Sequence, residues 1–395
     1  MVDQNKYLAY SYAGLCCTLI GIGLSRFAYT PILPLMVKHQ WLTSLQAGYL
    51  GAINFLGYLL GAMLARFCIQ LLGDRKSIDY ALIACTLSIF LCALPLGEHW
   101  LYFWRLVAGF SGAVLTVAAP TLIFSNLPHS LKGRASGIIF SGVGIGIILS
   151  GLLIPYISQF GLSFTWFVVG LIALLALLYA WFNLPQRERH EEMETQNFLA
   201  SLSELKWPVI LLSITYFFGA AGFTPHSLFL VAWMTFHFHF SVIYGGFCWA
   251  LFGIGAVIGT IGFGFAADRL GFPQCLMSVY TVAMLLIVVI LVTNNMIILA
   301  STSFLMGMLF LSTVSLSSAQ LSKLVTHHAY PSLWGMLTSL FALSQTATAF
   351  VISHFMQTLH GFLLTFLLAL VTLFIAAVAG AGLCCKHTKS EKDKN

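Results

Sequence analysis

The chain of 395 residues is 59% hydrophobic and only 8% charged, whereas about a quarter of the residues of a soluble globular domain are charged. This composition excludes an ordinary soluble protein and predicts an all-α membrane protein. The net charge of +6 is explained by basic residues in loops on one side of a membrane, so nucleic acid is not an expected partner.

Charge-free stretches locate the membrane-spanning helices, because one helix crosses the hydrocarbon core with about 20 apolar residues. The first half holds six helices: one with Arg26, one between Lys38 and Arg66, one between Asp79 and Glu98, one with Arg105, and two in the 52 residues between Arg134 and Arg187. In the second half, three charge-free gaps of 61, 53 and 62 residues each hold two helices and a turn. The sequence therefore predicts twelve transmembrane helices.

The Lys and Arg residues of the loops indicate the orientation of these helices, because cytoplasmic loops carry an excess of both. With a cytoplasmic N-terminus, Lys38 is the only basic residue in an external loop. The distribution predicts a multi-pass protein of the cell inner or plasma membrane with both termini in the cytoplasm.

A polar segment in the middle of the chain separates six helices from six. We expect an N-terminal six-helix bundle over 1–183, a cytoplasmic linker over 184–206, a C-terminal six-helix bundle over 207–385 and a cytoplasmic tail over 386–395. Transporters built from two related bundles bind substrate between them near the midplane of the bilayer. Weak internal echoes support this division: LGYLLGAMLAR in the second helix is similar to IGTIGFGFAADRLG in the eighth, and the openings of the fifth and eleventh helices are also alike.

Glycines in the second and eighth helices have the spacing of close helix contacts, because small residues let two backbones approach in lipid. They are Gly57, Gly61, Gly259, Gly262 and Gly264. An aspartate at the end of such a helix can pair across the contact and act as a gate. Asp268, with Arg269 beside it, is the best candidate, and Arg66 occupies the corresponding helix end in the first half.

The segment GFAADRLG, from Gly264 to Gly271, resembles the loop motif of the major facilitator superfamily. RLVAGFSGA, which begins at Arg105, is similar to the fourth-helix motif of that superfamily, and RFAYTP, which begins at Arg26, resembles the signature of its YbfB/YjiJ branch. The resemblance covers the whole chain. It implies a transporter with twelve helices in two bundles, a packing and coupling role for Arg105, and gating roles for the charged helix ends.

The first-half loop motif departs from the family pattern at one position. Ala65 stands where the motif has an aspartate, immediately before Arg66. A gate ion pair in this half would need another carboxylate, such as Asp74, or would be absent. For Arg66, a simple position at the membrane boundary is the stronger interpretation.

Arg26 lies inside an otherwise apolar helix, and an arginine at the bilayer centre costs about 2.5 to 3.5 kcal/mol on insertion scales. It should therefore face a partner or a wet cavity. No Asp or Glu occurs within the twelve predicted spans, since Glu98 and Asp268 lie at helix ends. A cationic site without a counter-ion suits an anionic substrate, whose carboxylate or phosphate a guanidinium holds through two hydrogen bonds. The alternative is that Arg26 snorkels to the membrane interface.

Other polar residues in the predicted spans complete the candidate substrate site. Tyr29 and Thr30 follow Arg26 by three and four residues, which places them on its side of an α-helix. The remaining candidates are Asn54, Tyr58, His226, Thr338 and Gln345, the last two from a stripe of the eleventh helix that also contains Phe341 and Thr348. Hydrogen bonding between helices would produce the same polar stripes, so both interpretations remain open.

Proton coupling has few candidate groups in a chain without embedded carboxylates. It would use His226 or His354, which we expect to be deeply placed, or Glu98, or the substrate itself, since histidine titrates near neutral pH. The sequence has no phosphate-binding GxxxxGK[ST] loop, no embedded Asp to complete a catalytic triad, and no metal-ligand spacing among its nine cysteines.

These observations predict a non-enzymatic secondary transporter, without cofactor or metal, that moves a small organic anion across the membrane. An exporter of small apolar or aromatic compounds is the first alternative, favoured by an aromatic content of 14%. A membrane sensor that transports nothing is the second, although the central linker is too short for a separate signalling domain.

Overall fold

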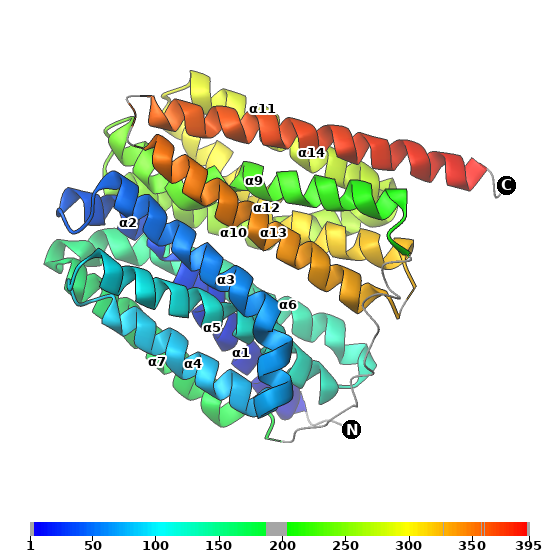
Figure 1. Ribbon diagram of the computed structural model, residues 1–395, viewed down its shortest axis with the longest axis horizontal. Helices are drawn as coiled ribbons and strands as arrows, with labels where there is room; N and C mark the ends of the chain where they lie inside the picture. The colour runs from blue at the N-terminus through cyan, green and yellow to red at the C-terminus, as the bar shows by residue number, and fades with distance from the viewer. Residues whose placement is uncertain (1–3, 187–203, 327, 357, 359, 393–395) are drawn as a thin grey trace.

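Apolar stretches of the chain form long helices, because an unbroken helix satisfies its backbone hydrogen bonds without water. Figure 1 presents the computed structural model, which describes residues 4–186, 204–326, 328–356, 358 and 360–392. The first half contains α1 (Gln4–Thr18), η1 (Leu19–Phe27), α2 (Tyr29–Lys38), α3 (Ser44–Leu72), α4 (Asp74–Leu91), α5 (Glu98–Ser125), α6 (His129–Ile157), η2 (Ser158–Phe160) and α7 (Leu162–Asn183).

The second half contains α9 (Trp207–Phe236), α10 (Val242–Leu270), α11 (Phe272–Val292), α12 (Met296–Leu324), α13 (Tyr330–Phe355) and α14 (Gly361–Lys392). Because α1, η1 and α2 form one continuous span, the described residues contain eleven helices that are long and apolar enough to cross a membrane. Helix α4 is more polar at its start and is not among these eleven; it packs against α5 and α7 as the twelfth long helix of the described residues.

Helix α4 begins at Asp74, so the expectation that the third helix lies between Asp79 and Glu98 was wrong about its start. The Nε atom of Arg75 donates to both carboxylate oxygens of Asp79, at 3.0 and 3.1 Å. Its two Nη atoms donate to the carbonyls of Leu184 and Trp181 at the end of α7, at 2.9 and 2.7 Å. These charged residues belong to the helix because Arg75 pairs with Asp79 and donates to carbonyls that are free at the end of a neighbouring helix.

Both ends of the described chain lie on one side of the molecule (Figure 1), which we call the terminal face. The opposite side, where α2 and α9 end, is the far face. Helices α1 to α7 pack into one bundle and α9 to α14 into the other. The bundles meet along a seam formed by α3 with α13, α6 with α10, and α2 with α9.

The seam is closed in its far-face half. A Cβ atom added to Gly48 of α3 would lie 2.5 Å from the Oγ atom of Ser353 of α13. A Cβ atom added to Gly151 of α6 would lie 2.5 Å from the carbonyl oxygen of Gly246 of α10. Neither position has room for a larger residue, so the two bundles are in direct contact there.

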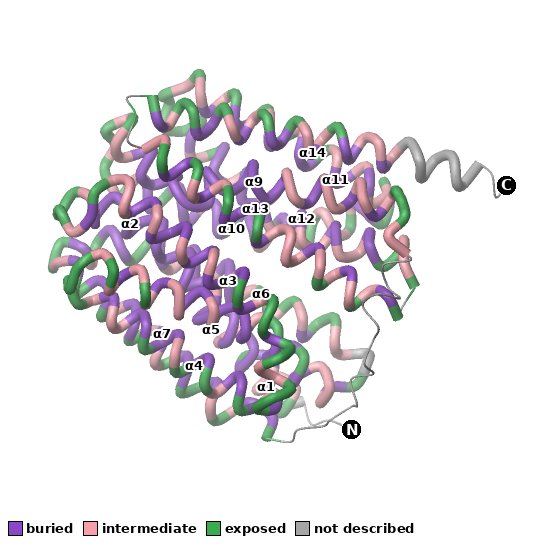
Figure 2. The backbone as a smooth tube through the Cα atoms, in the orientation of Figure 1, coloured by how far each residue is buried: buried purple, intermediate pink, exposed green. Residues whose placement is uncertain are grey.

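In its terminal-face half the seam is open. Along α6, a Cβ atom would meet α10 at Gly151 and, through the side chain of Val257, at Gly144, but it would meet no atom within 4 Å at Gly137 or Gly133, so the two helices separate toward the terminal face. Figure 2 shows the same change along α3, whose residues turn from mostly buried or intermediate to mostly exposed as the helix approaches the terminal face. The protein is therefore in a conformation that opens toward the terminal face.

The predicted glycine contacts hold for three of the five positions. Gly57 and Gly61 pack against backbone carbonyls of α5, and Gly259 packs against the backbone of Met308 in α12. The prediction was wrong for Gly262 and Gly264, because α10 borders open space at this depth.

Candidate functional site

Arg26 occupies an unusual backbone segment near the middle of the seam. It lies at the end of η1, a nine-residue π-helix, and the N–H of Ala28 closes the segment on the carbonyl of Gly23 at 3.1 Å. Position 23 favours glycine, because a Cβ atom there would lie 3.0 Å from both the carbonyl oxygen of Gly142 and the Cα atom of Gly146 in α6. π-Helical turns are rare and frequently occur at functional sites. They also break α-helical spacing, so Tyr29 does not share the side of Arg26 as expected.

The Arg26 side chain points across the seam and not toward the membrane interface. It is 8% exposed, and its Nη2 atom donates to Oε1 of Gln345, on α13 of the other bundle, at 2.5 Å. Its guanidinium carbon lies 4.0 Å from the ring centroid of Phe55, 5.3 Å from Phe27 and 5.5 Å from Tyr58. No carboxylate of the described residues pairs with it. One amide oxygen and aromatic faces therefore balance the charge.

Two donors at this contact are buried without a partner. They are Nε of Arg26 and Nε2 of Gln345, and neither donates to any atom of the described residues. Leaving a buried donor unpaired costs about 1 to 3 kcal/mol, so a pair of such donors at one place indicates a group that binds there. Both are N–H groups, which an anion or a carbonyl oxygen would satisfy.

An aromatic wall continues from this contact toward the terminal face. The ring of Tyr216, on α9, lies 5.9 Å from Trp334 and 4.6 Å from Phe341, with interplanar angles of 30° and 32°. Trp334, Phe341 and Gln345 share one face of α13, and the first two are half-buried whereas Gln345 is buried. We use "aromatic wall" for Tyr216, Trp334 and Phe341. Tyr58 of the opposite bundle is half-buried, with its ring centroid 5.5 Å from the guanidinium carbon of Arg26.

The structure thus brings together Arg26, Tyr58, Thr338 and Gln345 along the open part of the seam. Thr338 lies on the same stripe of α13 and donates to the carbonyl of Trp334 at 2.8 Å. Sequence reasoning did not select Phe55 or the residues Tyr216 and Trp334 of the aromatic wall. In a chain with 14% aromatic residues, a single ring at a helical position carries no distinguishing signal.

Three other predicted residues pack inside the N-terminal bundle. Arg105 is 2% exposed, donates through Nη1 to the carbonyl of Ser25, and lies 4.7 Å from the ring centroid of Tyr29. The hydroxyl of Tyr29 donates to the carbonyl of Ala47 at 2.7 Å. Asn54 donates through Nδ2 to the carbonyl of Arg105 at 3.0 Å. Their polar groups hold α2, α3 and α5 together in this conformation.

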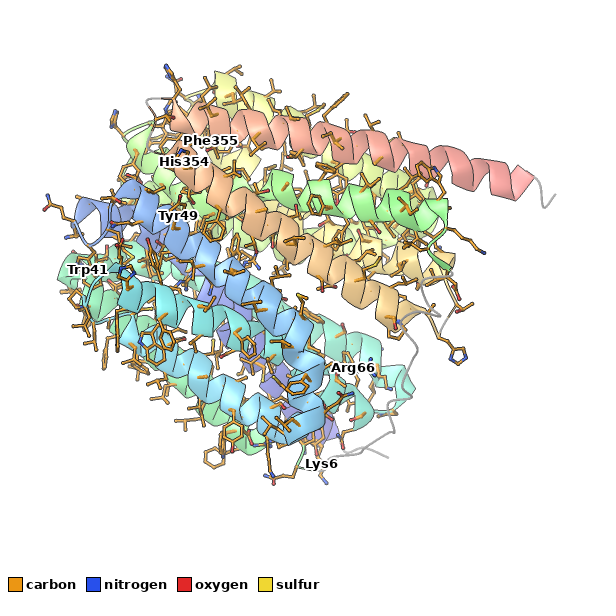
Figure 3. All side chains as sticks on the ribbon, viewed as in Figure 1. Lys6, Trp41, Tyr49, Arg66, His354 and Phe355 are labelled. Atoms are coloured by element: carbon orange, nitrogen blue, oxygen red, sulfur yellow. The ribbon has the colours of Figure 1, made fainter. Side chains whose placement is uncertain are left out.

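Thr30 and His226 lie in the closed half of the seam. The hydroxyl of Thr30 donates to the carbonyl of Ser227 in α9 at 2.7 Å, which joins the two bundles. His226 is fully buried with its ring 5.6 Å from that of Phe252, and neither ring nitrogen bonds to a described residue. The expectation that His354 is deeply placed was wrong, because it is exposed near the far-face end of α13 (Figure 3).

The charged helix ends named as gate residues are exposed at the terminal face. Asp268 and Arg269 close α10, and no described residue forms an ion pair with Asp268. Figure 3 shows Arg66 toward the terminal face of α3, whereas Tyr49 lies at the other end of the helix, where α13 crosses it. These charged residues therefore lie where the two bundles are separated.

Two cavities lie away from Arg26. One, of about 250 Å³, is at the far face and is lined by residues that include Leu33, Phe229 and Phe362. The other, of about 570 Å³, lies between α10 and α12 beside Phe247 and Phe304. Neither is lined by a charged side chain, and the described residues contain no cluster of His, Cys, Asp and Glu that could hold a metal. The groups that could orient a polar solute are at the seam.

Two six-helix bundles that are closed at one face, open at the other and polar at mid-seam define a membrane transporter of the major facilitator fold. The chain belongs to the family described as the uncharacterised MFS-type transporter YbfB, whose model matches residues 18–381. It is 26% identical over 268 residues to the uncharacterized MFS-type transporter YceJ of Bacillus subtilis, covering 65% of this chain and 66% of that protein. It is 24% identical to Multidrug resistance protein 2 of the same organism, covering 57% of each.

The matched region thus spans about two thirds or less of these curated relatives. Two solved structures share the fold over nearly the whole chain. A bacterial homolog of the human lysosomal transporter Spinster, in an inward-facing and unoccupied conformation, has a TM-score of 0.74 at 15% identity, covering 97% of both chains. A D-xylose-proton symporter has a TM-score of 0.71 at 12% identity, covering 94% of this chain and 96% of its own.

Proposed function

We propose that this transporter carries a small organic anion across the cytoplasmic membrane by secondary active transport, with Arg26 as the anion anchor. The observation that carries the proposal is the Arg26–Gln345 contact. A buried guanidinium faces the other bundle, lacks a carboxylate among the described residues, and keeps an unpaired N–H beside the unpaired amide of Gln345. An intramembrane charge with free donors is best explained by a ligand of opposite charge.

The transport cycle in this proposal is alternating access, with the bundle of residues 1–183 rocking against that of 207–385 around Arg26. The linker 184–206 lies mostly outside the described residues, and its domain boundaries remain a prediction. The loop charges support a cytoplasmic terminal face, so the conformation described above is open to the cytoplasm. Reporter fusions at the C-terminus test this orientation, and activity only on the outside would contradict it.

Substitution of Arg26 tests the anchor directly. We expect Arg26→Ala to abolish transport and binding of the anion while the protein stays inserted and folded. Arg26→Lys keeps the charge but loses the planar fork, so binding through two hydrogen bonds should weaken markedly, whereas a snorkelling arginine would tolerate lysine. Exposed Arg134→Ala, near the start of α6, is the matched control. If Arg26→Ala bound the anion with wild-type affinity, the proposal would be wrong.

Export of small apolar or aromatic compounds is the second candidate. The half-buried rings of Trp334 and Phe341 favour it, as does the similarity to a protein named for multidrug resistance. Such a transporter would tolerate the loss of Arg26. Transport of neutral aromatic compounds by Arg26→Ala at the wild-type rate would establish this alternative.

Proton coupling and gating complete the proposal. His226 remains the embedded candidate for carrying a proton, and one solved structure of similar fold is a proton symporter. In the present conformation its burial without a partner disfavours the charged imidazolium, so protonation would require the conformation that opens this half of the seam. Asp268, with Arg66 and Arg269, would close the terminal face in the opposite conformation. We expect Asp268→Asn to raise cysteine labelling of the terminal-face halves of α12 and α13, and unchanged labelling would reduce Asp268 to a boundary residue.

A further inference from the structure

We infer that the substrate is an aromatic monocarboxylate, an organic acid with one carboxylate attached to a flat ring. The inference rests on the proposed anion function. It adds the number of charges on the substrate and the shape of the rest of the molecule, here called its body. It is based on three features of the seam: a single available cation, a second donor on the facing helix, and an aromatic surface one helical turn away.

The number of available cations limits the charge of the ligand. Arg26 is the buried cation at the seam. Arg105, the other deeply buried arginine, also has an unpaired Nε, but it lies inside the N-terminal bundle, where it donates to the carbonyl of Ser25 and lies beside the ring of Tyr29. A second negative charge on the ligand would be buried without a partner, which is strongly unfavourable. The site therefore suits a monoanion better than a dicarboxylate.

The two unpaired donors fit one carboxylate. The guanidinium of Arg26 has a free Nε, and Gln345, whose oxygen already faces Arg26, has a free Nε2. The oxygen assignment of this amide follows from its partner, because an arginine can only donate. A carboxylate that reaches both groups would contact both bundles at once, as a substrate of an alternating-access transporter must.

The body of the ligand would lie against the aromatic wall. Phe341 precedes Gln345 by one turn of α13, about 6 Å along the helix axis at 1.5 Å per residue. Its ring and that of Tyr216 form a tilted pair with centroids 4.6 Å apart and an interplanar angle of 32°, and Phe341 is half-buried beside the open part of the seam. A ring carried next to the carboxylate would reach this surface, where ring faces and edges pack favourably.

The test is a binding panel on the purified full-length protein, measured by calorimetry and by the shift in melting temperature. The probes are benzoate, cyclohexanecarboxylate, phthalate, methylphosphonate and neutral benzyl alcohol. We expect benzoate to bind about three- to tenfold more tightly than cyclohexanecarboxylate, the range expected of one aromatic contact. Phthalate, with its second carboxylate, should bind at least tenfold more weakly than benzoate, and benzyl alcohol should not bind.

Variants of the aromatic wall assign any preference to this surface. Phe341→Leu should make benzoate and cyclohexanecarboxylate bind equally, while Phe341→Tyr should keep the difference. Trp334→Leu, at a half-buried position, repeats the test if Phe341→Leu does not fold. Phe374→Leu, which removes an exposed ring of α14, is the control and should change neither affinity.

The outcomes separate this inference from the proposed function. Equal binding of the two carboxylates, tighter binding of phthalate or methylphosphonate, or an unchanged preference in Phe341→Leu and Trp334→Leu overturns the aromatic monocarboxylate. The anion function survives those results as long as Arg26→Ala removes binding. If no anion binds, or if benzyl alcohol binds as tightly as benzoate, both proposals fail.

Discussion

Arg26 and Arg105 are both buried arginines that donate to an oxygen and lie near an aromatic ring, yet their surroundings differ in origin. The partners of Arg105, the carbonyl of Ser25 and the ring of Tyr29, come from its own bundle. The hydrogen-bond partner of Arg26, Gln345, comes from the other bundle. Movement of one bundle against the other leaves the first environment intact and changes the second. An embedded charge is thus structural or functional according to which helices supply its partners.

The largest expected effect separates the two arginines by stability. Arg105→Ala should lower the free energy of unfolding by about 2 to 5 kcal/mol, because it leaves a cavity and an unpaired carbonyl within a packed bundle. Arg26→Ala should cost less, since its side chain borders the open part of the seam. Thermal unfolding in detergent measures both. Equal losses of stability would remove the distinction drawn here.

Replacing Gln345 tests whether the free guanidinium is what binds the anion. Gln345→Glu places a carboxylate where the amide oxygen now lies 2.5 Å from Arg26, and should form an internal ion pair. We expect anion affinity to fall at least tenfold, because the substrate must compete with a tethered carboxylate. Gln345→Met removes the acceptor without adding charge and should bind the anion more tightly than Gln345→Glu. The reverse order would argue against Arg26 as the anchor.

A pair of glycines extends the comparison from side chains to the two halves of the seam. Gly151→Ala would bring a Cβ to 2.5 Å from the Gly246 carbonyl oxygen, so it should destabilise the conformation that is closed at the far face by about 1 to 3 kcal/mol. Labelling of a cysteine at Ser44, on the far face, should then increase. Gly335→Ala has open space beside it and serves as the control. Similar labelling in both variants would contradict the closed far face.

The smallest expected effect concerns a contact that stays within one bundle outside the membrane. Glu204, just before α9, accepts hydrogen bonds from the hydroxyl and the backbone N–H of Thr326, at 2.5 and 2.7 Å, and these bonds hold its pKa below its usual value of 4.5. Its contribution to stability is therefore present above pH 4.5 and is lost as the pH falls through the lowered pKa.

Comparison with Glu204→Gln measures this contribution. The melting temperature of the variant should be slightly below that of the wild type near neutral pH, and the difference should disappear in acid. A difference that persists below the lowered pKa would mean that the carboxylate charge is not what holds the linker end to the loop between α12 and α13.

Much of the architecture could be predicted from local properties of the chain. The charge-free gaps located the spans, and the loop motif at Asp268 with the signature at Arg26 indicated the family. The hydrophobicity of a span depends only on its own residues and determines whether that segment can cross the bilayer. These predictions succeed for that reason. The start of α4 was misplaced because the charges of Asp74 and Arg75 resemble those of a loop, whereas Arg75 is held by Asp79 of the same helix and by carbonyls at the end of α7.

The candidate site could be predicted only in part. Arg26 was identifiable because an unpaired charge in an apolar helix is rare, and Gln345 because it lies on a polar stripe. The separation of Tyr29 from Arg26 was hidden by the π-helix, whose spacing differs from the α-helical spacing that sequence reasoning assumes. The aromatic wall carried no signal, since its rings resemble those of any lipid-facing helix.

The sequence by itself determined the all-helical membrane fold, the family and the presence of one charge in need of a partner. Tertiary structure alone decided that this partner is Gln345, 319 residues away, and that Arg105 turns into its own bundle. It also decided that the seam is closed at the far face and open at the terminal face. The physical reason is that periodicity and hydrophobicity act within a helix, whereas contacts across the seam depend on how twelve helices pack and on which of two conformations the bundles adopt.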